Sequence, residues 1–255
     1  MLGNKLSPAQ KDELAKITHA RKYSVIHDSD FNCFRNCVNQ APSILDIGAN
    51  RGQSIVSLKS IFPEASIVSY EANPLFWPVL ESLASHYRDV KIVRHGLGSS
   101  NGTLAFYIPV VDEIEYLEEA SIRRDNFELD WVKARLKSYG HNLVLKTTQV
   151  EIRRGDEVCR DYRPDIIKID VEGAEYDVIE SLEETISGTL PILLVENSDY
   201  NRVTGFLRER GYRDYQYIPD NNCLKPLTEA CTNTFYVHDK SMSRFIPSMK
   251  FVDSL

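Results

Sequence analysis

The stretch Ser43-Ile-Leu-Asp46-Ile-Gly48-Ala-Asn50-Arg-Gly52 decides the fold class of this 255-residue chain. An apolar run leads into a turn that holds two glycines. Ile55, Leu58 and Phe62 then recur at the spacing of a helix face. A buried strand, a glycine turn and an amphipathic helix in this order predict one unit of a parallel α/β sheet.

The same alternation of apolar runs and amphipathic segments continues along the chain. Further strands are predicted at 66–71, 90–95, 165–170, 191–196, 212–217 and 234–238, and helices at 74–87, after 170 and at 201–210. Continuously apolar strands that alternate with helices belong to sheets covered on both faces. Because crossovers are right-handed, the pattern predicts a doubly wound α/β fold, in which ligands bind beyond the carboxyl ends of the strands.

One domain is expected, at residues 43–240. Residues 1–42 are predicted to form a helical lead-in, whose helix begins with a capping box between Ser7 and Gln10. Residues 241–255 are predicted to be a C-terminal tail.

An insertion is predicted at about 99–163, because this stretch is too long for a simple crossover. It holds a predicted antiparallel pair of strands, at 103–109 and 143–153, and a helix at 126–138. The irregular residues 111–124 are a candidate lid over the ligand cleft. The insertion is therefore interpreted as a cap between the third and fourth strands.

The composition excludes several classes of protein. The formal net charge of -7 argues against a nucleic-acid groove, which needs a basic footprint. No apolar run approaches the roughly 20 residues of a membrane span, and the first residues lack the apolar core of a signal peptide, so we expect a cytoplasmic protein. Five scattered cysteines do not form a disulfide framework, and Cys33 and Cys37 have no further zinc ligands at the required spacing.

Two acidic residues at strand ends indicate a nucleoside cofactor with a cationic group. Asp46 precedes a G-x-x-x-G turn, which differs from the G-x-G-x-x-G of dinucleotide-binding sites and suits an ammonium group better than a phosphate. Glu71 ends the second strand, where an acid accepts hydrogen bonds from ribose hydroxyls. Together they indicate S-adenosylmethionine (SAM). The alternatives are a plain strand-to-helix turn and an exposed carboxylate.

Three motifs in this order resemble the FkbM family of SAM-dependent methyltransferases. They are ILDIGANRG at 44–52, SYEANP at 69–74 and IIKIDVEGAE at 166–175. The resemblance covers about residues 43 to 240. It implies the seven-stranded class I methyltransferase fold, which is Rossmann-like and mostly parallel with an antiparallel last strand. It also implies methylation of hydroxyl groups in secondary metabolites or glycans.

By this resemblance, the first turn holds the methionine part of SAM, Glu71 holds the ribose, and residues near 72–73 and 95–97 border the adenine. The predicted cofactor-binding residues are Asp46, Gly48, Ala49, Asn50, Gly52, Ser54, Glu71, Ala72, Asn73, Gly96, Leu97 and Asp170.

The third motif carries the candidate catalytic residues Lys168, Asp170 and Glu172. Alternation along the strand places Lys168 and Asp170 on the same side of the sheet. Methyl transfer needs an aligned nucleophile that loses its proton, a task for these carboxylates or for a Lys168–Asp170 pair. A buried ion pair is the structural alternative for Lys168. Glu175 is assigned to the first turn of the following helix.

Glu196 and Asn197 end the fifth strand and, with Asp170, form a trio of oxygen ligands that could hold Mg²⁺. Hydrogen bonding to the substrate is the alternative, and no metal site is assigned. Candidate substrate contacts are His141, Tyr116, Arg123, Arg124 and Tyr200. The arginine pair would matter for an acceptor that carries phosphate or carboxylate.

The sequence therefore predicts a methyltransferase that moves a methyl group from SAM to a hydroxyl of a small molecule or glycan precursor. Three alternatives stay open: N-methylation of a small, phosphorylated or unphosphorylated acceptor, an NAD-linked oxidoreductase, and a SAM-binding protein without catalysis. The missing G-x-G-x-x-G speaks against the oxidoreductase. The sequence leaves the oligomeric state open, and it predicts no nucleic-acid partner because it shows neither a basic stripe nor an Asn/Asp-Pro-Pro-aromatic motif.

Overall fold

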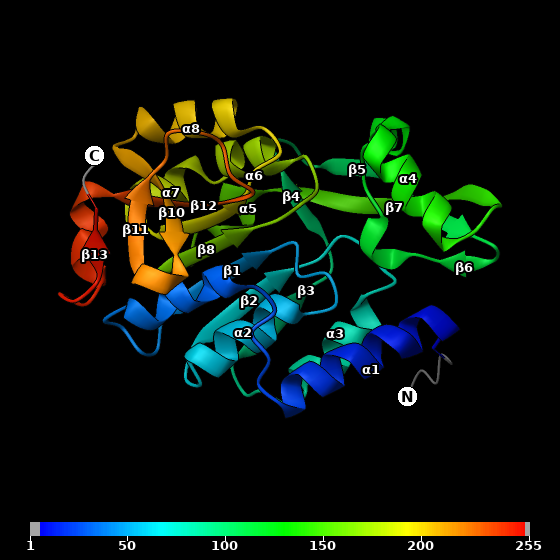
Figure 1. The fold of residues 1–255 in the computed structure, drawn as a ribbon, viewed down its shortest axis with the longest axis horizontal. Coiled ribbons are helices and arrows are strands. Elements are labelled where there is room, and N and C mark those ends of the chain that lie inside the picture. Colours follow the sequence, from blue (N-terminus) through cyan, green and yellow to red (C-terminus); the bar gives the residue numbers. More distant parts are fainter. Residues whose placement is uncertain (1–5, 253–255) are drawn as a thin grey trace.

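The computed structural model describes residues 6–252, and within them nine strands form a central sheet (Figure 1). The spatial order is β13 (Lys250–Phe251), β11 (Cys223–Pro226), β10 (Tyr212–Ile218), β12 (Asn233–His238), β9 (Ile192–Glu196), β8 (Ile166–Ile169), β1 (Ser43–Ile47), β2 (Ser66–Tyr70) and β3 (Val90–Val93). Strands β1, β2, β3, β8 and β9 are parallel to their neighbours in this group. Strand β12 runs antiparallel to β9 and β10.

The doubly wound α/β fold with seven predicted strands and an antiparallel last strand is confirmed. Two strands of the central sheet were not predicted, because β11 has four residues and β13 two, too few to show a period. They extend the edge beyond β10, and β13 lies in the segment predicted as a tail. The sheet is thus wider than the seven strands of the prediction.

Helices cover both faces of the sheet (Figure 1). On one side lie α1 (Pro8–Lys22), the 3-10 helix η1 (Ser29–Asn36), α2 (Gln53–Ile61) and α3 (Trp77–Ala84); on the other lie α5 (Gly155–Cys159), α6 (Glu175–Ser181), α7 (Glu183–Thr189) and α8 (Tyr200–Arg208). Two more 3-10 helices, η4 (Pro219–Asn221) and η5 (Asp239–Arg244), flank the last strands. Among residues 6–252, every helix is too short or too polar to cross a membrane.

The helix of the lead-in begins as predicted. Ser7 Oγ accepts a hydrogen bond from the Gln10 backbone N–H at 3.2 Å, and Gln10 Oε1 accepts one from the Ser7 N–H at 2.9 Å. This reciprocal pair satisfies two N–H groups that the helix itself leaves free. The first five residues of the lead-in and the last three of the tail lie outside the described residues.

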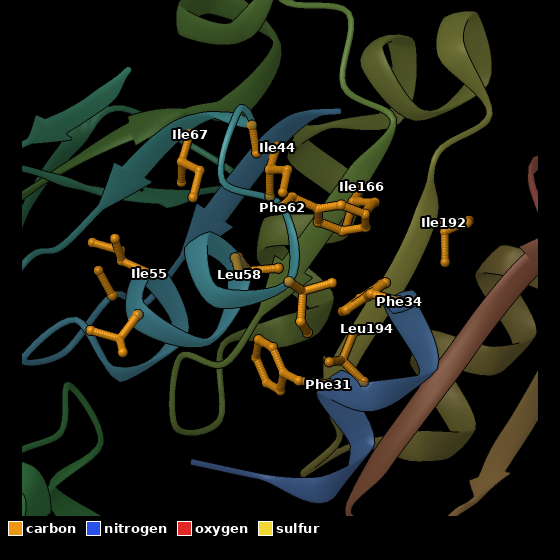
Figure 2. Packing of buried hydrophobic residues seen from close by; sticks show 14 of the residues in the cluster. Phe31, Phe34, Ile44, Ile55, Leu58, Phe62, Ile67, Ile166, Ile192 and Leu194 are labelled. Carbon is orange, nitrogen blue, oxygen red and sulfur yellow. The ribbon is translucent and has the colours of Figure 1, made fainter. Parts of the chain in front are cut away.

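The apolar core lies on both faces of the sheet because side chains alternate along each strand. Ile44 and Ile166 face η1 and α2, and Figure 2 shows them packed with Phe34 and Phe62. Their strand neighbours, Leu45 among them, face the opposite cluster with α6 to α8. The carboxyl ends of the parallel strands are thereby held at one edge.

A second sheet, whose strands come between β3 and β8 along the chain, forms the cap. Its order is β4 (Gly96–Gly98), β7 (Leu143–Arg154), β5 (Gly102–Val111) and β6 (Ile114–Glu115). β5 and β7 pair in antiparallel register, which confirms the predicted strand pair. The other cap elements are η2 (Leu117–Glu119), η3 (Arg124–Glu128) and α4 (Asp130–Tyr139), so the cap's α-helix begins four residues later than predicted.

Candidate functional site

A cavity of about 310 Å³ lies between the carboxyl ends of the central strands and the cap. The chain runs from β1 to β2 on one side, whereas β8 flanks β1 on the other, so strand order reverses beside β1. Such a switch point is where doubly wound sheets bind ligands. Of the predicted site residues, Gly48, Asn50, Glu71, Ala72, Asn73, Gly96, Leu97, Asp170 and Glu172 line this cavity.

The turn after β1 requires glycine at position 48. Its φ is +82°, and a Cβ atom there would lie 1.7 Å from the backbone oxygen of Asp170. The N–H groups of Gly48 and Ala49 both donate to the Tyr70 carbonyl, at 3.0 and 3.1 Å. These contacts hold the turn against the ends of β2 and β8, which brings the first and third motifs together.

The Glu71 carboxyl group, which lines the cavity, accepts hydrogen bonds from two backbone N–H groups. Its Oε2 accepts from the Asn50 N–H at 2.7 Å and its Oε1 from the Asn73 N–H at 2.6 Å. Burial raises the pKa of Glu71 to about 7, although these N–H groups and Lys168 act in the opposite direction. The carboxyl group is therefore fixed in place at the end of β2 and faces the cavity.

Two carboxamide groups at the cavity keep a polar atom without a hydrogen-bond partner among the described residues. They are Asn73 Nδ2, in a residue that is 1% exposed, and Gln53 Oε1. Buried polar atoms of this kind point to a ligand, because leaving them unsatisfied is costly. The sequence did not single out Gln53, although its place directly after the Gly52 turn could have drawn attention to it.

Asp46 lies beneath the cavity rather than along its wall. It is fully buried, and its Oδ2 accepts from the hydroxyls of Ser54 and Ser69, both at 2.9 Å. Its Oδ1 lies 3.6 Å from Lys168 Nζ and has no hydrogen-bond partner among the described residues. Ala49, Gly52 and Ser54 also lie outside the lining, so contacts of these four residues with a cofactor stay a prediction.

The Lys168 side chain, on β8, contacts both the turn after β1 and the residue that follows its own strand. Its Nζ donates to the Gly48 carbonyl at 2.6 Å and lies 3.2 Å from Asp170 Oδ2. Burial alone would lower the pKa of Lys168, but Asp170 and Asp46 outweigh it and leave the pKa raised. The lysine is thus a buried cation that orients Asp170, and both the ion pair and the same-side placement predicted for it are present.

Glu172 and Glu196 add two more acidic groups to the wall beside Asp170. Burial, then the nearby Asp170, raises the pKa of Glu196 to about 8, and it raises the pKa of Glu172 to about 7. Glu172 lines the cavity and, as a whole residue, is exposed. Glu175 accepts from the Gly173 N–H at 2.8 Å at the start of α6, as predicted.

No metal site is shown among the described residues, and the magnesium trio of Asp170, Glu196 and Asn197 stays a prediction. None of their His, Cys, Asp and Glu side chains form a group of three placed to hold a metal ion. In the predicted magnesium trio, Asn197 donates from its Nδ2 to the Tyr236 hydroxyl at 3.0 Å, and its Oδ1, the atom that would face a cation, has no hydrogen-bond partner among the described residues. Cys33 and Cys37 are buried free thiols, and burial raises the pKa of Cys37 to about 12.

Residues 117–122 of the predicted lid lie along the cavity. Glu118 forms ion pairs with Arg51, which follows the first glycine turn, and with Lys16 of α1 at 3.5 Å. Arg51 also contacts Glu13 at 3.2 Å. These pairs connect the cap to the lead-in helix through the glycine turn that follows β1, a connection that the sequence did not reveal.

The five candidate substrate contacts lie off the cavity lining. Tyr116 stacks on Tyr139 at 4.2 Å, and Arg123 pairs with Asp125 at 2.7 Å. Tyr200 donates to Asp214 at 2.6 Å. His141 follows the cap helix, where its N–H donates to Asp112, and Arg124 begins η3. The structure instead brings Phe127, Trp131 and Arg135 of the cap to the cavity.

Comparison with known proteins supports this assignment of the fold and the motifs. The family model described as the methyltransferase FkbM domain matches residues 46–213. Methyltransferase sdnD of Sordaria araneosa is 31% identical over 166 residues, which cover 56% of this chain and 61% of the relative. The 2-O-methyltransferase NoeI of Sinorhizobium fredii is 28% identical over 178 residues, which cover 68% of this chain and 70% of the relative.

Among solved structures, the methyltransferase FkbM of Methylobacillus flagellatus matches with a TM-score of 0.51 and 14% identity. The match covers 78% of this chain and 44% of that chain, so this chain spans less than half of the solved protein and about three fifths of sdnD. The likeness in structure supports the fold, and the family match covers more than half of the sequence. The chain belongs to the FkbM methyltransferase family.

Proposed function

We propose that the protein binds SAM in the cavity and transfers its methyl group to a hydroxyl of a small molecule or glycan precursor. The observation that carries the proposal is the Glu71 carboxyl, fixed at the end of β2 and facing a cavity at the switch point of the sheet. Membership in the FkbM family supports it, and so does the activity in the name of the relative NoeI.

The residues at the sheet side of the cavity fit this cofactor. Glu71 would accept hydrogen bonds from the two ribose hydroxyls. Asn73, with its unpartnered Nδ2, and the neighbouring Ala72 and Leu97 would border the adenine. The loop from Gly48 to Gly52 would hold the methionine part, with Gln53 Oε1 as a further acceptor for its ammonium group.

SAM, when bound, supplies a methyl group on a positively charged sulfur that an aligned nucleophile can attack. The chain has to position the acceptor hydroxyl and take its proton. Asp170 and Glu172 line the cavity at the end of β8 and are the proposed proton acceptors. Lys168 orients Asp170 from below, and Asp46 in turn balances the charge of Lys168. Asp46 thus has a positioning role in this proposal.

Calorimetry with S-adenosylhomocysteine tests the cofactor. We expect binding by the parent protein and an affinity about 10- to 100-fold lower for Glu71→Gln, because a hydrogen bond to a charged group contributes about 1.5–3 kcal/mol. Glu81→Gln is the matched control, because Glu81 pairs with Arg94 outside the cavity. A folded parent that binds no S-adenosylhomocysteine would rule out the proposal, and binding of NADH instead would favour an oxidoreductase.

The acceptor atom needs a separate measurement. Incubation with SAM and a panel of hydroxyl and amino compounds, followed by mass spectrometry, should reveal products heavier by one methylene unit. Methylation of hydroxyl compounds supports the proposal. Products confined to amines would replace it with N-methylation in the same cavity.

A further inference from the structure

The cap side of the cavity contains a group of apolar side chains. They are the buried residues Phe106, Leu117, Phe127 and Val132, all of which line the cavity. Trp131 also lines it but is 62% exposed, which places this ring at the rim. A ligand in this half therefore gains most from an apolar body of its own, as in most small-molecule sites.

The polar groups of the same cavity are predominantly acidic. Of the described lining residues, six carry a carboxyl group and one carries a permanent positive charge; the carboxyls are Glu71, Glu118, Glu119, Asp170, Glu172 and Glu196, and the cation is Arg135. Arg135 is already engaged, because it lies 2.7 Å from Glu119 and donates to the Tyr139 hydroxyl at 3.0 Å. No unengaged cation among these lining residues faces an incoming anion.

The wall around Asp170 already disfavours negative charge. The pKa values of Glu172 and Glu196 are raised by burial and then by the charge of Asp170. A phosphate or carboxylate on an acceptor would place a negative charge beside Asp170, at a wall where Glu172 and Glu196 already favour their protonated, uncharged forms, and this is unfavourable at short range. Arg123, which could have received such a group, pairs with Asp125 outside the cavity lining.

We propose that the acceptor is uncharged or cationic and carries an apolar body, which lies under the cap against Phe127 and Trp131. Acceptors that carry phosphate or carboxylate are disfavoured, because every described cation of the lining is already paired and further negative charge is costly beside Asp170. This inference rests on the proposed function, because it assigns the cap side of the same cavity to the acceptor.

Three probes that differ in one group test the charge. They are 2-(4-hydroxyphenyl)ethanol, 2-(4-hydroxyphenyl)ethylamine and 4-hydroxyphenylacetate, titrated by calorimetry into protein saturated with S-adenosylhomocysteine. We expect the alcohol and the amine to bind at least about tenfold more tightly than the acetate, because like charges at close range disfavour a ligand. The titrations are made once with EDTA and once with Mg²⁺.

Two variants change the charge at the cap in opposite directions. Glu119→Gln frees Arg135 from its ion pair, so the acetate should gain affinity and the difference between the probes should narrow. Arg135→Gln removes the cation from the cavity lining, so the difference in affinity between the acetate and the other two probes should widen. Lys133→Gln is the matched control, because Lys133 on the same helix pairs with Glu128 and does not line the cavity; it should leave the affinities unchanged.

Equal affinity for the three probes, tighter binding of the acetate with or without Mg²⁺, or no binding of the alcohol would each overturn this substrate class. The same changes in Lys133→Gln as in Arg135→Gln would show that net charge, rather than the cavity wall, sets the preference. A parent protein that fails to bind S-adenosylhomocysteine contradicts the proposed function, and this step is measured first.

Discussion

Glu71 and Glu118 line the same cavity but are held in different ways. Glu71, at the end of a sheet strand, receives two backbone N–H groups and is 8% exposed. The Glu118 side chain, in the cap, is 35% exposed and is held by the side chains of Arg51 and Lys16. Backbone donors cannot move without unfolding the sheet edge, whereas long side chains can rearrange. The sheet side of the cavity is therefore the more rigid one, and under the proposed function this rigid side would hold the cofactor while the more adaptable cap side would receive the acceptor.

The largest effect should come from Gly48→Ala, which attacks the sheet side directly. A Cβ atom would overlap the Asp170 backbone oxygen, and the φ of +82° is unfavourable for alanine. We expect a loss of at least about 4 kcal/mol in the free energy of unfolding, measured in urea. Gly188→Ala is the control, because Gly188 lies in α7 with no atom within 4 Å of an added Cβ. A stable Gly48→Ala protein would show that the turn is not preorganised.

The pH dependence of stability should reveal the buried charge of Glu71. Its pKa is about 7 in the folded protein, against an ordinary glutamate value of 4.5, so the folded state binds more protons between these values. The contribution of Glu71 to the free energy of unfolding therefore falls as the pH rises from about 4.5 to 7. Glu71→Gln has no carboxyl at this position and lacks this loss. Relative to the parent, the variant should gain up to about 3 kcal/mol across this range without cofactor.

Urea unfolding at several pH values measures the difference between Glu71→Gln and the parent. The amide that replaces the Glu71 carboxyl loses a hydrogen bond, which shifts the free energy of unfolding of the variant by the same amount at every pH. The expectation requires a pH-dependent gain in addition to this constant shift. Curves that stay parallel from about pH 4.5 to 8 would contradict the expectation, because they would mean that Glu71 is not a buried carboxyl. Glu81→Gln, at an exposed ion pair, should give parallel curves.

The smallest effect is expected for Glu118→Gln in the cap. Exposed ion pairs contribute roughly 0–1 kcal/mol, so the free energy of unfolding should change by less than about 1 kcal/mol. Hydrogen exchange of the backbone at residues 117–122 should become faster, because the cap loses its connection to Arg51 and Lys16. A loss of more than about 2 kcal/mol would show that the cap is as rigid as the sheet edge.

Much of the fold was predictable because its signals are local. The apolar runs of β1, β2, β8 and β9 are short stretches of chain that show their burial directly. The glycine turn at 48 is equally local. The edge strands β11 and β13 could not be predicted, since their pairing depends on segments that meet only after folding.

The candidate site divides in the same way. Glu71 and Asp170 were found because each follows a recognisable strand. The hydrogen bonds from Ser54 and Ser69 to Asp46 were not predicted, because hydrogen bonds between side chains depend on register and rotamer. Ser54 was predicted only as a cofactor contact. The cap residues at the cavity were missed for a related reason: Trp131 and Arg135 reach it only because α4 packs against β5.

The sequence by itself determined the family and the succession of strands and helices that makes an α/β fold. It also determined which acidic residues stand at the strand ends. These features are encoded in backbone requirements and hydrophobic period, which act over a few residues. Only the tertiary structure decided which carboxyl groups line the cavity and which lie beneath it, and how the cap is attached. Glu13, Arg51 and Glu118 are far apart along the chain, so their contact exists only in the folded protein.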